Sequence, residues 1–363
     1  MAAHSCGCLV VQAAVRALRS QPETLVPLVE RLLGWPGMAN ASNPPDGVSG
    51  GLRELACSVG GARSLEALLE AAPAKLLFPL YSGGLRSHLL ELSHDKNANF
   101  VVQRLLERAS DPALVGLLVG ELADAGAELL AGGRAGVLWK LLEACARAKC
   151  KEKEAFRAVV SMLSPAGSSA ATLAHSLLAL SPNLTEERIA SANPTPLGSR
   201  LAQACLQLPP AACQPLIASF HKMSNPEFAK LACDSVGSRV VEALFVAPGC
   251  PAGSHPPLAK KLKGEAARLA RDRCGSHALE KCFASVDVDG KRAILNELLL
   301  AETSLASSPH AALVCKKVRL ADYKRRQTDW LDEETGHEKK RRMFADILAP
   351  DTPATAAAAA TAA

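Results

Sequence analysis

The amino-acid sequence predicts an all-α fold, a curved α-solenoid built from helical repeats. The first observation is a helical pattern at residues 236–245, with Ser238, Arg239 and Glu242 on a polar face and apolar residues at helical spacing opposite. The same pattern returns clearly at residues 275–283, 198–206 and 98–107, and more weakly at 61–66 and 7–12. Repetition of one helical pattern is typical of a repeat protein rather than of a single globular core.

The spacing of the copies is the second observation. The last polar residue of the pattern recurs after 37 residues from Glu66 to Gln103, after 39 from Gln203 to Glu242, and after 38 from Glu242 to Glu280. A period in this range with helical texture between the copies indicates a solenoid, in which each unit buries its apolar face against its neighbours.

Composition is the third observation. Hydrophobic residues make up 48% of the chain but aromatic residues only 4%, so the core must consist mainly of Leu, Ala and Val, which suits closely stacked helices. No apolar run is long enough to span a bilayer and no signal sequence is present, so we expect an intracellular chain without membrane contact. The twelve cysteines contain no C-x-x-C spacing, which favours buried thiols and predicts no metal site or cofactor.

The repeats can be followed in chain order. A first helix at 7–18 lacks a preceding partner, so we expect the chain to begin inside a longer repeat array. Further helices are expected at 22–33, 61–71, 85–92, 98–109, 114–123, 134–147, 215–222, 226–233, 258–271, 291–300 and 310–318, with loops at 34–51 and 246–257. Residues 153–163 and 169–180 are predicted to form a separate helix pair that lacks the polar pattern.

The order of these predicted helices and the composition of the C-terminal part divide the chain into three regions. Residues 1–320 are predicted to form the repeat array, 321–348 a basic C-terminal extension, and 349–363 a disordered Ala-rich tail. The run Lys339–Arg342 is either a solvated tail or a segment for nuclear targeting or RNA contact. The formal net charge of +5 is small, and residues 1–315 hold 31 basic against 28 acidic side chains. Any binding of nucleic acid must therefore come from a locally arranged face.

Each copy of the pattern offers three side chains at positions one, two and five of a helix, which we call the triplet. The second position holds Arg, His or Phe, whose flat groups can stack on a base, and its neighbours can hydrogen-bond a base edge. The candidate RNA-binding residues are Arg63, Glu66, Asn99, Phe100, Gln103, Ser199, Arg200, Gln203, Ser238, Arg239, Glu242, Ser276, His277 and Glu280. In the degenerate copies, Ala135, Gly136 and Trp139 replace the triplet at 134–147, and Ala311 and Cys315 at 310–318.

These triplets resemble those of Pumilio-type RNA-binding repeats, which are armadillo-type helical repeats. The resemblance implies that Ser238 with Glu242, and Ser276 with Glu280, recognise guanine. By the same resemblance Asn99 with Gln103 recognises uracil, and adenine is assigned to two further pairs, Ser199 with Gln203 and Cys8 with Gln12.

The degenerate repeats and the segment Asp322–Arg326 before Trp330 narrow the resemblance to the nucleolar protein nine family. This resemblance implies binding of pre-ribosomal RNA, contact with pre-ribosomal assembly factors, a place in the nucleolus or nucleus, and a role in small-subunit rRNA processing and ribosome assembly.

Two alternatives stand beside this interpretation. Each triplet Ser could be a helix N-cap with Glu as its capping partner, although recurrence at near-constant spacing weighs against that. A protein-binding armadillo or HEAT-type scaffold would have a similar architecture without RNA contact. An enzyme is not expected, because the chain has no phosphate-binding glycine loop, no H-E-x-x-H and no nucleophile motif, and we expect no small-molecule substrate.

Overall fold

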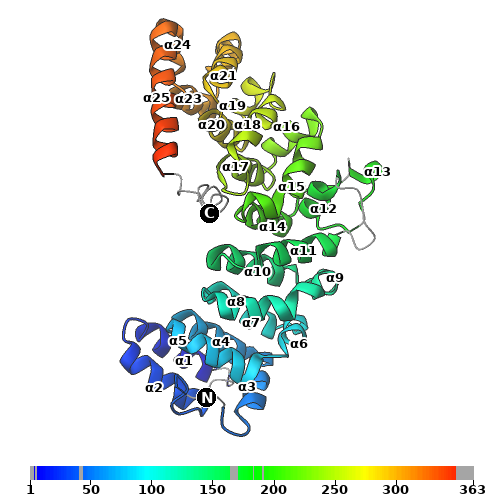
Figure 1. The fold of residues 1–363 in the computed structure, drawn as a ribbon, viewed down its shortest axis with the longest axis vertical. Helices are drawn as coiled ribbons and strands as arrows, with labels where there is room; N and C mark the ends of the chain where they lie inside the picture. Colours follow the sequence, from blue (N-terminus) through cyan, green and yellow to red (C-terminus); the bar gives the residue numbers. More distant parts are fainter. Residues whose placement is uncertain are drawn as a thin grey trace, which may run out of the picture. The chain divides into compact units, whose positions relative to one another are not determined.

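The computed structural model describes residues 4, 6–40, 44–163, 171–182, 184–189 and 192–348, and every regular element within them is a helix (Figure 1). The all-α repeat prediction is confirmed. The chain divides into two compact units, Met1–Ser254 and His255–Ala363. Among the described residues no helix is long and apolar enough to cross a membrane. The tail predicted at 349–363 lies outside the described residues.

The first unit consists of repeats of three helices, of which the third carries the triplet. A complete example comprises α8 (Pro112–Leu122), α9 (Gly126–Ala131) and α10 (Ala135–Ala148). Successive third helices pack directly on one another and form a continuous row within the unit (Figure 1). This row consists of α1 (Gly7–Ala17), α4 (Val59–Ala71), α7 (Ala98–Arg108), α10, α14 (Pro196–Leu206) and α17 (Ser238–Val246).

A first and a second helix precede each third helix of this unit from α4 onward. The first helices are α2 (Pro22–Leu33), α5 (Ala74–Leu80, continued by the π-helix η1, Tyr81–Leu85), α8, α11 (Glu152–Leu163) and α15 (Pro210–Lys222). The second helices are α3 (Val48–Cys57), α6 (Leu89–His94), α9, α12 (Leu173–Ala179) and α16 (Asn225–Cys233). Short elements η2 (Ala123–Ala125), α13 (Glu186–Ile189) and η3 (Ala252–Ser254) lie between them.

Three details of the sequence prediction need correction. Helices α11 and α12 are not a separate pair, because α12 packs against α14 and the two helices complete its repeat. The loop predicted at 34–51 ends earlier, because α3 begins at Val48. Residues 258–271 do not form one helix: α18 (His255–Lys260) and α19 (Ala266–Arg271) are separated by a turn in which Gly264 has a φ of +85°.

Arginine side chains tie successive third helices together at their C-terminal ends. Arg147 on α10 donates to the carbonyl of Leu106 at 2.8 Å and to that of Ala109 at 2.7 Å, both at the end of α7. Arg108 on α7 donates in the same way to Ala72, at the end of α4, at 3.3 Å. The last carbonyls of a helix have no partner within the helix, so these contacts satisfy them and also fix the spacing of the repeats.

The second unit contains two further repeats and a C-terminal pair of helices. The repeats are α18, α19 and α20 (Gly275–Ser285), followed by α21 (Val288–Leu300), α22 (Glu302–Leu305) and α23 (Pro309–Lys317). Helices α24 (Leu320–Arg325) and α25 (Gln327–Leu348) then pack against α21. Lys291 of α21 is buried and pairs with Glu334 of α25. The first part of the predicted extension is therefore a folded part of this unit.

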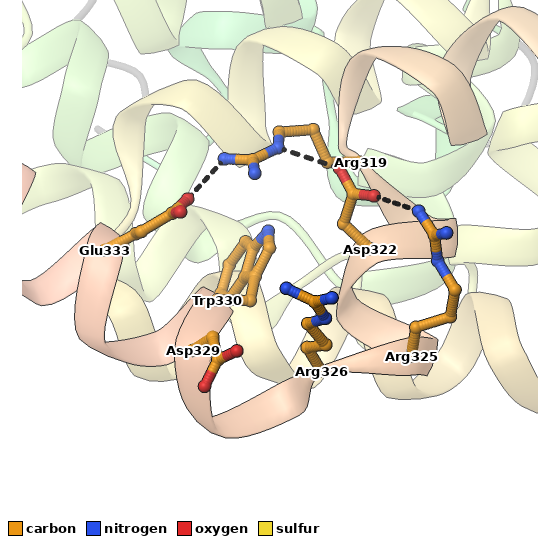
Figure 2. Close-up of a pocket in the computed structure, with 7 residues that line it drawn as sticks. All are labelled: Arg319, Asp322, Arg325, Arg326, Asp329, Trp330 and Glu333. Atoms are coloured by element: carbon orange, nitrogen blue, oxygen red, sulfur yellow. Dashed lines mark hydrogen bonds and ion pairs between the residues drawn. The ribbon is translucent and has the colours of Figure 1, made fainter.

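Trp330 lies at the centre of the contact between α24 and α25. Its ring meets the ring of Tyr323 edge-on, with centroids 5.2 Å apart. A cavity of about 320 Å³ lies beside it, and Figure 2 shows the acidic and basic side chains that line this cavity together with Trp330. Arg319 pairs there with Asp322 at 3.2 Å and with Glu333 at 2.9 Å. The charge of Arg319 is therefore neutralised locally, and its two ion pairs connect α24 with α25.

Candidate nucleic-acid interface

The three positions of the triplet have a regular exposure in the eight third helices. The residue at position one is 4% exposed or less in every helix: Cys8, Ala62, Asn99, Ala135, Ser199, Ser238, Ser276 and Ala311. The residue at position five is half-buried throughout: Gln12, Glu66, Gln103, Trp139, Gln203, Glu242, Glu280 and Cys315. The residue at position two is exposed in all of them except Gly136 of α10. Each third helix except α10 therefore presents an exposed residue at position two beside two recessed ones.

A close approach between helices sets this geometry. The residue before position one is glycine in several repeats, and a Cβ atom there would collide with the second helix of the same repeat. At Gly198 the Cβ would lie 2.2 Å from the carbonyl oxygen of Leu178, and at Gly61 it would lie 2.1 Å from that of Leu55. At Gly237 it would lie 2.3 Å from a methyl group of Leu231. Because only glycine fits, the start of each of these third helices is held against its neighbour.

The triplet of α7 is organised by internal hydrogen bonds. The Asn99 amide donates to the carbonyls of Asp95 at 2.8 Å and Lys96 at 3.0 Å, while its oxygen accepts from Gln103 Nε2 at 3.0 Å. Phe100 is 52% exposed beside this pair. Gln103 thus has a fixed orientation, and its amide retains donor and acceptor capacity for the edge of a base.

The triplet of α14 also connects two repeats. Ser199 Oγ donates to the carbonyl of Val236, just before α17, at 2.9 Å and accepts from Gln203 Nε2 at 3.0 Å. The Ser199 hydroxyl therefore links α14 to the segment before α17 and also orients the amide of Gln203. Arg200 extends from the neighbouring position and is exposed.

The two Ser–Glu pairs hold a carboxylate next to a cation. Glu242 of α17 lies 3.5 Å from the guanidinium of Arg239, and their side chains are 16% and 63% exposed. Glu280 of α20 lies 2.5 Å from Lys317 of α23, with side chains 17% and 61% exposed. In both pairs the acceptor is recessed and the cation is exposed. A carboxylate in this position can accept from two donors of one base edge.

Glu66 occupies the fifth position of α4, where burial is the main influence on the pKa of its carboxyl group. Burial raises the pKa of this carboxyl, and the guanidinium groups of Arg104 and Arg63 partly oppose that effect. Arg63 itself is exposed at position two. The structure therefore places all fourteen sequence-predicted residues on third helices, but the residues at position one are buried rather than exposed on a polar face.

The helix-capping alternative is not what the structure shows for these serines. Neither Ser238 nor Ser276 is the N-cap residue, and α14 is capped by Thr195 rather than by Ser199. The turn before the helix is held instead by an aspartate, which the sequence analysis missed. Asp234 Oδ1 accepts from the backbone N–H of Gly237 at 2.7 Å, and Asp272 makes the equivalent contact at 2.6 Å. Their recurrence four residues before the serine was a readable signal.

The cysteines show no sign of a metal centre. Six of the twelve are buried, four are half-buried, and Cys6 and Cys57 are exposed, so the expectation of buried thiols fits only part of the set. Burial raises the pKa of Cys282 to about 12 and that of Cys213 to about 11. Within the described residues no group of three or more His, Cys, Asp or Glu side chains is placed to hold a metal ion.

Comparison with known proteins identifies this arrangement of repeats. A family model described as "NOP9-like PUF repeat domain" matches residues 1–310. The chain belongs to this family. The NOP9-like PUF family consists of RNA-binding repeat proteins and not of enzymes.

Individual relatives of the NOP9-like PUF type are identical to this chain at about a quarter of the aligned positions. Pumilio homolog 23 of Arabidopsis thaliana is 27% identical over 345 residues, covering 93% of this chain and 46% of that protein. Nucleolar protein 9 of Mus musculus is 28% identical over 308 residues, covering 79% of this chain and 48% of that protein. The chain therefore spans about half the length of these relatives.

A solved structure shares the fold. The structure of APUM23-GGAUUUGACGG superposes with a TM-score of 0.81 and 26% identity, covering 90% of this chain and 61% of that chain. The suspected resemblance to nucleolar Pumilio-like proteins is thus confirmed.

Proposed function

We propose that this chain binds single-stranded RNA without catalysis, through the triplets of its third helices. The observation that carries the proposal is the repeated combination of an exposed Arg, His or Phe with a recessed polar pair. A flat exposed group supports stacking of a base, and a recessed amide or carboxylate supports recognition of its edge. The likeness to APUM23-GGAUUUGACGG supports the same proposal.

The proposed base preferences are those that the Pumilio resemblance implies for each recessed pair, and the chemistry of guanine agrees with its assignment. Guanine presents N1–H and an amino group, which suits the carboxylates of Glu242 and Glu280 beside their serines. Uracil offers both a donor and acceptors, which suits the amide of Gln103 held by Asn99. Adenine is assigned to Ser199 with Gln203, and to Cys8 with Gln12, where the same amide faces a smaller neighbour. The residues Arg63, Phe100, Arg200, Arg239 and His277 are proposed as the stacking groups.

The cellular role follows from the relatives rather than from the geometry. Relatives named Nucleolar protein 9 support a place in the nucleolus or nucleus. Pre-ribosomal RNA is the target that the resemblance of the triplets implies. We propose that the chain acts in small-subunit rRNA processing and ribosome assembly, together with pre-ribosomal assembly factors. A protein-binding scaffold is the second candidate, favoured by the near-neutral charge of residues 1–315.

A specificity swap tests base recognition at one repeat. RNAs bound from a randomised pool by wild-type protein are sequenced beside those bound by the double variant Ser238→Asn with Glu242→Gln. We expect the preference at one nucleotide to move from guanine to uracil while the other positions stay unchanged, because only one recessed pair changes. An unchanged preference at every position would refute edge recognition by α17.

Loss of stacking tests whether the triplet face binds RNA at all. Arg239→Ala should weaken RNA binding by about 5-fold to 150-fold, since one stacked base is worth roughly 1–3 kcal/mol. The matched control is Arg157→Ala on α11, which removes an exposed arginine from a first helix. Equal affinities of the two variants would refute the assignment, and a wild-type protein that binds no RNA would favour the scaffold.

A further inference from the structure

Helix α10 lies in the middle of the row of third helices but has no polar triplet. Ala135 is at position one, Gly136 at position two and Trp139 at position five. Neither Ala135 nor Gly136 can hydrogen-bond or stack on a base through a side chain. The indole of Trp139 thus occupies a position that holds Gln or Glu in every other third helix of the first unit.

Two cations lie over the indole ring. The guanidinium carbon of Arg200 is 4.9 Å from the ring centroid, and Lys140 Nζ is 3.9 Å from it. Arg200 belongs to α14, the next third helix of the row, where it is the flat residue at position two. Trp139 therefore already contacts the group with which α14 would stack on a base. Both distances lie within the range of cation–π attraction.

The separation leaves no room for a base between the two groups. Stacked layers approach to about 3.5–4.0 Å, so a base inserted between a guanidinium and an indole needs roughly 7–8 Å between them. The observed 4.9 Å is too short for such an insertion. The face of Arg200 that points toward α10 is occupied by the side chain of Trp139.

The other side of α10 is also occupied by protein atoms. A Cβ atom added to Gly136 would lie 3.1 Å from Oε1 of Gln103, so the Gln103 side chain lies against the glycine. A flat side chain at position two would displace Gln103, whose amide is held by Asn99 at 3.0 Å. Glycine at this position and tryptophan at position five are thus complementary, and together they close the position that a base would take.

We propose that Trp139 takes the place of a base, so that the α10 repeat recognises no nucleotide. The ligand is then a bipartite single-stranded RNA. One recognised segment binds at α1, α4 and α7, and the other binds at α14 and α17. At least one spacer nucleotide of any identity lies between them. This inference rests on the proposed function, because it concerns the pattern of RNA recognition on the same face.

The test begins with RNAs selected by the wild-type protein from a randomised pool. We expect two blocks of preferred bases separated by one or more positions without preference. Each nucleotide of this spacer is then replaced by an abasic nucleotide, and the affinity is measured. We expect less than a 2-fold change for wild type, because no stacked base is lost. A loss of about 5-fold or more, or an uninterrupted block of preferences, would overturn the proposal.

A variant that opens the position provides the converse test. In Trp139→Ala the space beside Arg200 becomes free, so RNA with an intact spacer base should bind at least about 5-fold tighter than its abasic counterpart. Trp139→Phe keeps a ring and should behave as wild type. Equal affinity of Trp139→Ala for both RNAs, with an unchanged melting temperature, would contradict the idea that the indole occupies a base position.

Tryptophan fluorescence adds a readout that does not need a variant. The other two tryptophans, Trp35 and Trp330, are 1% and 2% exposed, so quenching by a stacked base would come from Trp139. We expect little quenching when selected RNA binds, and strong quenching would show that Trp139 stacks on a base instead. If the wild-type protein binds no RNA from the pool, the proposed function fails first, which distinguishes the two failures.

Discussion

Replacement of Gly198 by alanine tests the close approach that positions the α14 triplet. A Cβ atom at this residue would lie 2.2 Å from the carbonyl oxygen of Leu178 and 2.5 Å from that of Leu177. Both neighbours are backbone atoms at the end of α12, so no flexible side chain can move aside. The Leu178 oxygen also accepts hydrogen bonds from Thr195 N–H at 2.8 Å and from Thr195 Oγ1 at 3.0 Å. Any shift of α12 therefore disturbs the cap of α14.

The change in the free energy of unfolding that Gly198→Ala causes is the sum of two unfavourable contributions and one favourable contribution. Overpacking of a close helix contact costs about 1–3 kcal/mol. Weakening of a hydrogen bond at Thr195 adds about 1 kcal/mol. Alanine favours the helix over glycine by about 1 kcal/mol, which offsets part of the cost. We expect a net destabilisation of about 1–3 kcal/mol. In a unit of this length that lowers the melting temperature by roughly 2–10 °C.

The assay is thermal unfolding followed by circular dichroism, with Gly116→Ala as the matched control. Gly116 lies within α8, where an added Cβ would meet nothing within 4 Å. The control should therefore raise stability by about 0.5–1 kcal/mol through helix propensity alone. The reasoning is refuted if Gly198→Ala is as stable as the control variant, because α12 would then not constrain the start of α14.

Two further predictions concern the first unit. Arg147→Lys should cost about 1–3 kcal/mol in urea unfolding, because a lysine cannot reproduce the forked bonds to Leu106 and Ala109; a cost below about 0.5 kcal/mol would contradict this role. Burial raises the pKa of Glu66, so its folded-state pKa lies above that of the unfolded chain, and stability falls as pH rises through it. Glu66→Gln should therefore raise the melting temperature at pH 7 but not below about pH 4, and an equal gain at both pH values would exclude this cause.

Local periodicity was sufficient to predict the third helices. The helix expected at 98–109 is α7 at Ala98–Arg108, and that expected at 61–71 is α4 at Val59–Ala71. These helices combine an apolar stripe at helical spacing with a fixed polar face, so the pattern of one helix identifies the next. The residues of the triplets were therefore assigned to these helices before any tertiary contact was known, and their role in RNA binding stays a prediction.

Contacts between repeats were harder to predict. Helix α3 contains Gly50 and Gly51, which favour a loop, yet it forms because it packs against α4 and because Ser49 Oγ donates to the carbonyl of Gly83 at 2.5 Å. The assignment of α11 and α12 to the α14 repeat depends on the bond from Thr195 to Leu178, which spans 17 residues. Neither contact can be predicted from the periodicity of a single helix, because each joins residues that are far apart in the sequence.

The exposure pattern explains how the repeats keep their fold where the polar triplet is absent. Position one is buried in every third helix, so it accepts only small side chains, and Ala135 and Ala311 fill it as well as serine does. Position two is exposed in most repeats, so exchange of arginine for a small residue removes little packing. Loss of the polar triplet therefore requires no compensating change in the core. Trp139 is the exception, because a large ring at position five must find a partner, and Arg200 of the next repeat provides it. The α10 repeat is therefore packed into the row of third helices like its neighbours, with the indole of Trp139 against Arg200 of α14.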